Sequence, residues 1–397
     1  MYDKKSFLYL GCSGFPVGLA EIKKLTLISK GLIKEGNLVT VICNKGIHNS
    51  STHPYLRKSG NFEGINYIYS SGSPFRNDNF MVRNFLKIKG RINEVRLISK
   101  LKREHKLDYA ILSTHRFSDI IYYTTLAKAF GFKTILNHVE FYSGVKFKWS
   151  QMRKWINDKL YDNYAPKLID ISFPISEFII NHLKKVAPQK KYYKVPIMAE
   201  FEKYDGTQVM QEPFYFLFSG AAAYTEILQF IINSFNTLEN YDVYLYLAIK
   251  GNDEELNKIL EYIDKNPQRE KIKVFSTLNE KQLYNYYKNA KALLIPLRPT
   301  IQDAARFPHK IGEYLASGNP VISTNYGEIK HYFKDRDTML IAEAYDTKEF
   351  ADKMNYVVKN REEAENIGRN GKEFAFKNFK YELFGKRITD FLISIPI

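Results

Sequence analysis

Lys310 and Glu313 lie three residues apart in the segment RFPHKIGEYLASGNPVIST, which covers residues 306–324. At this spacing two side chains point to the same side of a helix. Near the positive N-terminus of a helix, an ammonium group suits a phosphate, and a carboxylate accepts hydrogen bonds from the hydroxyls of a diol. The same pair also suits an ordinary ion pair on a solvated face, so the rest of the chain has to decide between the two interpretations.

The residues around this pair predict a short helix that is followed at once by a buried strand. Pro308 suits the first turn of a helix, because the amide that proline lacks has no partner there. Ile311 and Leu315 keep the spacing of a core-facing stripe. Gly318 suits a left-handed C-cap. The apolar pair at 321–322 then predicts a strand, which places Lys310 and Glu313 on a helix that packs beside a sheet.

The whole chain alternates between apolar runs typical of strands and amphipathic stretches typical of helices. It opens with the run SFLYLGC, a glycine-rich loop, the helical stretch LAEIKKLTLISKGLIKEG and the run LVTVIC. This βαβ order predicts a parallel sheet. Further strands are predicted at GINYIYS, YAILS, KTILNHV and DISFPIS, and then at FYFLFSG, VYLYLAIKG, KIKVFS, ALLIPL and PVIST. The expected fold class is α/β, with two doubly wound Rossmann-like domains that face a central cleft and bind ligands at the carboxyl ends of their strands.

The length of 397 residues also favours two domains. We place the first at residues 1–197 and the second at residues 214–378. Residues 198–213 are of mixed composition with glycine and proline, and they are interpreted as a linker. Residues 379–397 are amphipathic and predict a helix that closes back on the first domain.

Composition and charge limit the class of protein. Both cysteines, Cys12 and Cys43, end apolar runs, which predicts reduced, buried thiols in a cytoplasmic protein. No apolar run reaches the roughly 18 residues that a membrane-spanning helix needs. Residues 1–200 hold 33 Lys and Arg against 15 Asp and Glu, whereas residues 201–397 hold 26 against 28. A positive surplus confined to one half predicts an anionic partner for that half.

The segment FPHKIGEYLASGNPVIST resembles the signature of glycosyltransferase family four, a retaining group with the two-domain GT-B fold. The opening GCSGFPVGLAE and the stretch LLIPLRPT fit the same family. The resemblance implies transfer of a sugar from a nucleotide-activated donor, held by the second domain, to an acceptor held by the first. In the bacterial surface-polysaccharide type, the acceptor is a lipid-linked or other glycan intermediate. The nucleotide sugar is then a substrate, and no cofactor is expected.

On the donor side, Glu313 matches the second glutamate of the family motif, which accepts hydrogen bonds from the donor ribose. The first glutamate falls at Ala305 and is missing. Lys310 matches a lysine that faces the diphosphate. The arginine and lysine that usually follow the first strand of this domain are absent from the loop SGAAAYTEI. Gly220 would let backbone amides approach the anion, and the positive charge is expected from Lys310 and from two arginines on the opposite wall, Arg298 and Arg306.

On the acceptor side, LNHVEFYSG follows a predicted strand and supplies His138 and Glu140 as candidate catalytic residues, with Glu140 as a possible base. The alternatives are an ordinary loop histidine beside an acid, and a donor phosphate that takes the proton itself. The loop STHRFSD supplies His115 and Arg116 toward the acceptor. Gly14 is a candidate donor-binding residue, because it would allow close approach of the first loop to the donor or the acceptor; the alternative is a structural turn.

The basic half also predicts a membrane partner. Residues 73–106 and 145–164 mix Phe and Trp with many Lys and Arg, including Lys146 and Lys148. Such a mixture suits the headgroup region of an anionic leaflet, so peripheral attachment to the inner face of the membrane is expected. The alternative is a solvated basic helix whose aromatic side chains face the core. No nucleic-acid recognition motif accompanies the charge.

Two other functions fit parts of the sequence. A sugar-nucleotide 2-epimerase shares the fold, and a non-catalytic basic binding protein explains the charge but not the Lys310–Glu313 helix. Asp335 and Asp337 have the spacing of a metal motif of another transferase fold. They follow a helical stretch and are interpreted as a solvent turn, so no metal is predicted.

Overall fold

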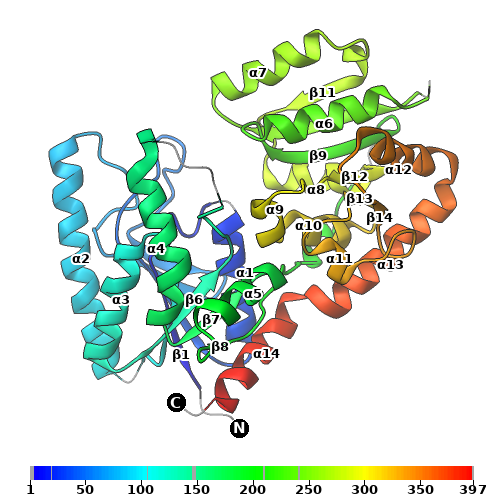
Figure 1. Cartoon of the computed structure of the whole chain (residues 1–397). Helices are drawn as coiled ribbons and strands as arrows, with labels where there is room; N and C mark the ends of the chain where they lie inside the picture. Colours follow the sequence, from blue (N-terminus) through cyan, green and yellow to red (C-terminus); the bar gives the residue numbers. More distant parts are fainter. Residues whose placement is uncertain are drawn as a thin grey trace. The chain divides into compact units, whose positions relative to one another are not determined.

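The computed structural model describes residues 4–18, 20–104, 106–144, 149–208, 211–239 and 242–395. The chain divides into two compact units (Figure 1). Unit 1 is Met1–Met198 with Tyr381–Ile397, and unit 2 is Ala199–Lys380. The segment expected as a linker carries the short helix η2 (Glu202–Tyr204) and belongs to unit 2 from residue 199 on.

Unit 1 is built on an eight-stranded sheet in the order β3-β4-β2-β1-β5-β6-β7-β8. All neighbouring strands pair in parallel except β3 and β4, which are antiparallel. Most of the parallel pairs are joined by a helix, and β2 and β4 are joined by the segment that carries β3. The strands are β1 (Ser6–Leu10), β2 (Leu38–Cys43), β3 (Ser59–Phe62), β4 (Ile65–Tyr69), β5 (Tyr109–Leu112), β6 (Lys133–His138), β7 (Ile171–Pro174) and β8 (Lys191–Tyr192).

Helices cover both faces of this sheet, so its strands are apolar on both sides. Phe7 and Tyr9 of β1 join one core with α1 and α14, whereas Leu8 and Leu10 join a second core with α2, α3 and α4. The helix α14 packs along α1, as predicted for the closing helix. The helices are α1 (Ala20–Lys34), α2 (Phe80–Arg103), α3 (Phe117–Phe130), η1 (Trp149–Gln151), α4 (Met152–Leu168), α5 (Glu177–Val186) and α14 (Tyr381–Ser394).

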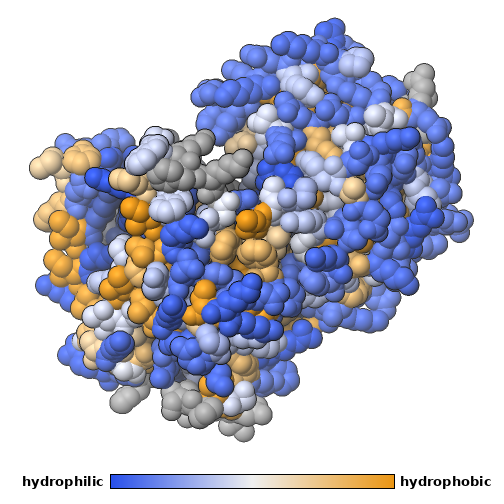
Figure 2. Space-filling model, viewed as in Figure 1, coloured by the Kyte–Doolittle hydropathy of each residue, from blue (hydrophilic) through white to orange (hydrophobic). Residues whose placement is uncertain are grey.

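The outer side of α2 is apolar and exposed. Its buried residues are Gly90, Glu94 and Ile98. Figure 2 shows apolar side chains gathered over the area in which Figure 1 draws α2, α3 and α4. The most exposed apolar side chains of this area are Phe80 (64%), Met81 (75%), Phe85 (64%), Ile88 (62%) and Ile92 (50%) on α2, and Trp149 (82%) just before α4. The aromatic residues of α2 therefore face outward rather than into the core.

Unit 2 is built on a six-stranded sheet in the order β11-β10-β9-β12-β13-β14, and every neighbouring pair is parallel. The predicted α/β fold, with two doubly wound parallel sheets, is confirmed. The strands are β9 (Tyr215–Ala221), β10 (Tyr244–Lys250), β11 (Ile272–Phe275), β12 (Ala292–Ile295), β13 (Val321–Thr324) and β14 (Leu340–Ala342).

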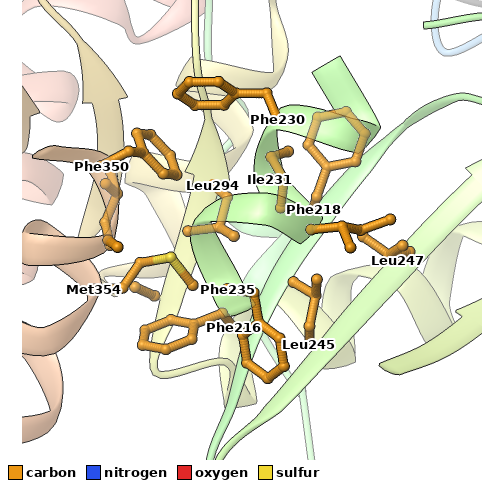
Figure 3. Close-up of a cluster of buried hydrophobic side chains, with 14 of the residues drawn as sticks. Phe216, Phe218, Phe230, Ile231, Phe235, Leu245, Leu247, Leu294, Phe350 and Met354 are labelled. Carbon is orange, nitrogen blue, oxygen red and sulfur yellow. The ribbon is translucent and has the colours of Figure 1, made fainter. Parts of the chain in front are cut away.

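One face of this sheet holds the hydrophobic core shown in Figure 3, where Phe216, Phe230, Phe235 and Met354 converge from strands and helices. The other face carries tyrosines: Tyr287 packs 5.0 Å from the ring of Tyr314 on α10. The helices of unit 2, besides η2, are α6 (Thr225–Asn236), α7 (Asp253–Asp264), η3 (Arg269–Lys271), α8 (Glu280–Asn289), α9 (Ile301–Ala305), α10 (Lys310–Ser317), α11 (Ile329–Tyr332), α12 (Thr347–Lys359) and α13 (Arg361–Phe379).

Each sheet has one point at which the strand order reverses. In unit 1 the chain runs from β1 outward to β2 and β4, and then returns to β5 on the other side of β1. In unit 2 it runs from β9 to β10 and β11, and then returns to β12. Ligands of doubly wound folds bind beyond the carboxyl ends of the strands at such a switch point. The exits of β9 and β12, and those of β1 and β5, are therefore the places to look for sites.

Candidate functional site

The exit of β9 carries a compact polar group. The Nζ of Lys310 donates a hydrogen bond to the Oγ of Ser219 at 3.1 Å. The backbone N–H of Ser219 donates to the hydroxyl of Tyr314 at 2.9 Å. A Cβ at Gly220 would lie 2.7 Å from the ring of Phe218, so glycine fits here without moving that ring. The first turn of α10 is thereby fixed against the carboxyl end of β9.

The helix α10 follows the prediction closely. It begins at Lys310 and ends at Ser317, and its C-cap is Gly318, which has a left-handed backbone with φ of 84°. Ile311 and Leu315 are buried, as their spacing predicts. Lys310 and Glu313 both belong to its first turn. The N-terminus of the helix, with its positive dipole end, therefore lies at the switch point of unit 2.

The exit of β12 is organised by Asp303, which is fully buried. Its carboxylate accepts hydrogen bonds from the backbone N–H and the Nε of Arg298, at 2.8 and 3.0 Å. It also lies 2.6 Å from Nη2 of Arg306. Arg298 reaches Glu226 at 3.0 Å as well, and Arg306 stacks over Tyr224, with its guanidinium carbon 5.3 Å from the ring centroid. Both predicted arginines are thus tied to Asp303.

Glu313 lies among tyrosines. Its side chain is half-buried, and its backbone carbonyl accepts a hydrogen bond from the hydroxyl of Tyr204 at 2.5 Å. Burial raises the pKa of Tyr204 and Tyr287 well above their usual range, and the negative charge of Glu313 adds to the shift. These phenols stay neutral hydrogen-bonding groups. Ala305, where the family's first glutamate would fall, is fully buried in α9.

In unit 1, the two candidate catalytic residues have different surroundings. His138 ends β6 and is fully buried, with its ring 6.0 Å from that of Tyr161. Burial lowers the pKa of His138 to about 3, with smaller contributions from His182 and Lys24. Its imidazole is therefore neutral near pH 7 and closed to solvent, which fits neither an accessible catalytic group nor the alternative of an ordinary loop histidine. Glu140, two residues later, is exposed.

The other predicted residues of unit 1 lie around the exits of β1 and β5. Gly14 has φ of 96°, and its carbonyl lies 2.8 Å from Nε2 of His48. His115 and Arg116 are exposed. A Cβ at Gly11 would lie 3.0 Å from the Cβ of Thr114, so the loops after β1 and β5 pack together. The switch point of unit 1 therefore brings Gly14, His115 and Arg116 to the same edge of the sheet.

The sequence did not reveal the environments of three buried polar residues. Asn137, beside His138, is buried, and its side-chain amide makes no hydrogen bond within the described part of the chain. Lys24 is buried in α1 and donates from Nζ to the carbonyl of Val195 at 3.0 Å. Asp303 is the third, and its carboxylate holds Arg298 and Arg306. For Asn137, the sequence offered one signal of a functional position, which is a polar residue near the end of an apolar strand.

Comparison with protein families matches residues 201–374 to Glycosyl transferases group 1. This segment is a glycosyl transferases group 1 domain. The match covers the switch point of unit 2, with Ser219, Lys310 and Glu313, and it confirms that the chain is a glycosyltransferase. A search of curated proteins returns no match.

Solved structures show the same fold over nearly the whole glycosyltransferase. A sucrose-phosphate synthase from Thermosynechococcus elongatus has a TM-score of 0.76 at 12% identity, covering 98% of this chain and 99% of that one. A glycosyltransferase from Rickettsia africae has a TM-score of 0.70 at 16% identity, covering 98% of each chain. Anabaena Alr3699/HepE, in complex with UDP-glucose, has a TM-score of 0.69 at 12% identity, covering 98% and 100%. The fold is therefore GT-B.

Two further observations concern the described residues of the glycosyltransferase. None of their helices combines the length and the apolar character needed to cross a membrane. In the same part of the chain, no three His, Cys, Asp or Glu side chains are grouped so as to hold a metal ion. Asp335 is instead a structural residue, which lies 2.6 Å from Nζ of Lys353 and accepts a hydrogen bond from the backbone of Ile341.

Proposed function

We propose that this glycosyltransferase transfers a sugar, with retention of configuration, from a nucleoside diphosphate donor bound at the switch point of unit 2. The observation that carries the proposal is the contact between Lys310 and Ser219, which holds a cation and a helix N-terminus at the exit of β9. Both features favour a phosphate. The Anabaena protein of the same fold was solved with UDP-glucose, which supports a nucleotide sugar as the donor class.

Two residues of α10, Glu313 and Lys310, bind different parts of the donor. The carboxylate of Glu313 accepts hydrogen bonds from the vicinal hydroxyls of the ribose, which its two oxygens suit. The ammonium of Lys310 stabilises the negative charge that grows on the diphosphate as it leaves. Arg298 and Arg306 contribute less, because the buried carboxylate of Asp303 neutralises much of their charge.

The chemical step breaks the bond between the anomeric carbon and the diphosphate oxygen, and forms one to an acceptor hydroxyl on the same face of the sugar. The acceptor proton passes to the departing phosphate oxygen. Glu140 is the second candidate to accept this proton, because its carboxylate is exposed to solvent. His138 is the weaker candidate, since its imidazole is buried and its pKa is lowered to about 3.

Incubation of the purified enzyme with a panel of radiolabelled nucleotide sugars tests this function. We expect slow hydrolysis of one donor without an acceptor and, at a donor concentration below the Kd, at least tenfold slower hydrolysis in the Glu313→Gln variant. An epimerase would instead interconvert the sugar of the donor, and a binding protein would leave every donor intact. Either of these outcomes contradicts the proposal.

We further propose that unit 1 attaches peripherally to the anionic inner face of the membrane and there meets a lipid-linked glycan acceptor. The supporting observation is the exposed stripe of Met81, Phe85, Ile88 and Ile92 on α2, which is flanked by exposed basic side chains such as Lys89. Exposed aromatic and basic residues together suit the headgroup region. Trp149, 82% exposed, adds a second anchor. Lys146 and Lys148, which the sequence also pointed to, lie outside the described residues.

A further inference from the structure

Basic side chains from three elements of unit 1 come together beside the switch point of its sheet. Lys45 lies two residues beyond β2, Lys87 lies on α2, and Arg116 lies in the loop between β5 and α3. We call these three residues the basic cluster. They lie near the edge of the sheet at which a ligand is expected.

The helix α2 reaches this edge through a close contact. A Cβ at Gly90 would overlap the carbonyl oxygen of Asn44, so only glycine allows the helix to lie this near the exit of β2. The amide of Asn44 also donates to the hydroxyl of Tyr123 on α3 at 3.3 Å. Lys87 and Arg91 flank Gly90 on the helix, and so they are brought beside Asn44 and its neighbour Lys45.

Arg91 ties α2 to the start of α3 and holds the cluster together. Its guanidinium lies 2.6 Å from Asp119 and 3.0 Å from Glu94. It also donates to the hydroxyl of Tyr123 at 2.8 Å. Asp119 in turn accepts a hydrogen bond from Thr114, in the loop that carries Arg116. Arg91 therefore satisfies the nearby carboxylates, and the three residues of the basic cluster lie around this framework.

The surroundings of Lys45 show how close the cations are. Burial lowers the pKa of Lys45, and the positive charges of Arg116, Lys87 and Arg91 lower it further. Two carboxylates counter them: Asp119, which is already paired with Arg91, and Glu21, whose pKa is raised mainly by burial. Within the described residues, no carboxylate lies within salt-bridge distance of Lys45, Lys87 or Arg116. The cluster therefore gathers positive charge without a matching counter-ion.

We propose that the basic cluster of Lys45, Lys87 and Arg116 binds a phosphate group carried by the acceptor. The proposal rests on the proposed function, because it assigns a substrate feature to the acceptor side of the same enzyme. Three cations from separate elements suit a compact anion of two charges, which meets several donors at once. A neutral sugar acceptor would leave these cations crowded together without an anion in salt-bridge contact, although Lys87 donates a hydrogen bond to the neutral side chain of Asn84 at 3.2 Å.

The phosphate has two possible sources, a soluble sugar phosphate or the phosphate of a lipid-linked intermediate. The full-length enzyme is therefore titrated by calorimetry with glucose 6-phosphate. In a second arm it is sedimented with neutral phosphatidylcholine vesicles that contain, or lack, a polyprenyl phosphate. The arm in which phosphate-dependent binding occurs identifies the source.

The variants Lys87→Gln and Arg116→Gln alter exposed side chains, so they keep the fold. We expect each variant to weaken phosphate-dependent binding about tenfold or more, because each loses one charge-assisted hydrogen bond to the phosphate. Lys45→Gln should weaken it similarly, and Lys45→Arg should restore it. Lys100→Gln is the matched control, because Lys100 lies on the same helix near Glu104, away from the cluster, with 66% of its side chain exposed.

The proposal is overturned if phosphate-dependent binding occurs in neither arm. It is also overturned if the cluster variants and Lys100→Gln weaken this binding equally. A UDP titration of the same preparations separates this outcome from failure of the proposed function. If UDP binds and phosphate does not, only the acceptor inference fails. If phosphate binds through the cluster and UDP does not, the cluster remains a phosphate site, but the donor assignment in unit 2 is wrong.

Discussion

Asp303 accepts three hydrogen bonds from Arg298, at 2.8 Å from its backbone N–H, 3.0 Å from its Nε and 3.3 Å from its Nη2. The same carboxylate binds Arg306 at 2.6 Å. One buried acid thus holds two arginines in the segment between β12 and α10. This explains how the segment keeps its shape although Ala305 stands where the family motif has an acid.

The first prediction concerns this buried acid. Asp303→Asn removes the buried negative charge that balances two guanidiniums. Arg306 then loses its carboxylate partner, and Arg298 keeps only the exposed Glu226. Breaking a buried pair in this way costs about 3–5 kcal/mol in the free energy of unfolding, which urea denaturation measures. Glu226→Gln is the control, because Glu226 is 69% exposed at the outer end of the same network and should cost below about 1 kcal/mol. Equal effects of the two substitutions would contradict the structural role of Asp303.

The second prediction concerns donor binding. Glu313→Gln keeps the shape of the side chain but removes the charge that strengthens hydrogen bonds from the ribose hydroxyls. We expect the Kd for the donor to rise by one to two orders of magnitude, roughly 1.5–3 kcal/mol, with an unchanged unfolding midpoint. Calorimetric titration with the nucleotide sugar measures it, and an unchanged Kd would show that Glu313 does not bind the ribose.

The third prediction separates catalysis from stability. Lys310→Ala should lower kcat about 100-fold or more, because a fixed cation matters most where charge grows on the leaving group. The free energy of unfolding should change by no more than about 1 kcal/mol. Lys258→Ala on α7 is the control, since Lys258 forms only a surface pair with Glu254. If Lys310→Ala turns over as fast as this control, another cation faces the diphosphate, and Arg298 is the next to test.

The fourth prediction is a pH dependence from Lys24. Burial lowers its pKa from 10.5 to about 7 in the folded protein. Between these two values the unfolded chain holds the proton and the folded chain does not, so the contribution of Lys24 to stability rises with pH. Below about pH 7 both states are protonated, and this contribution is flat at its least favourable level.

The difference between wild type and Lys24→Met isolates this effect. The free energy of unfolding of wild type should rise more steeply with pH above 7 than that of the variant, by at most about 1.4 kcal/mol per pH unit. Urea denaturation at pH 7, 8 and 9 measures both slopes. Lys34→Met on the same helix, where Lys34 is 55% exposed, should keep the wild-type slope. Identical slopes for wild type and Lys24→Met would mean that Lys24 stays charged in the fold.

The fifth prediction concerns the outer side of α2. Phe85→Glu and Ile88→Glu place acids on the exposed stripe, and should abolish sedimentation with anionic vesicles at low salt. The exposed positions have no packing to lose, so the fold should remain. Leu260→Glu, at an exposed position of α7 that is 41% accessible, is the control. Failure of the wild-type enzyme to sediment would remove the membrane proposal and the lipid-linked acceptor with it.

Local patterns in the sequence predicted the fold well. The run LVTVIC is β2, and the residues around Lys310 form a helix with its left-handed cap at Gly318. Such elements depend on residues that are close in sequence. The strand β14, only three residues long, and the antiparallel β3 escaped prediction because short strands are specified by their neighbours in the sheet.

The sites were less predictable, because burial and pairing depend on residues far apart in the chain. His138 was expected to be an accessible catalytic residue at the end of a strand, but Tyr161 on α4 helps to enclose it. Arg91 looked like one more surface cation of α2, whereas Asp119, on a different helix, draws it inward. Arg298 and Arg306 were expected to face the donor, and the charge of Asp303 turns out to hold them. The spacing of residues in the sequence does not predict which distant residues become partners in this way.

The position of α14 in the chain affects the order in which the protein folds on the ribosome. Phe384, Ile388 and Leu392 complete the core that covers α1, but they are synthesised after the whole of unit 2. Unit 2 is continuous in sequence, so all of its strands and helices are available as soon as Lys380 has emerged. We therefore expect the apolar face of α1 to stay exposed to solvent until α14 has been synthesised. An exposed apolar face of this kind is what chaperones bind during synthesis.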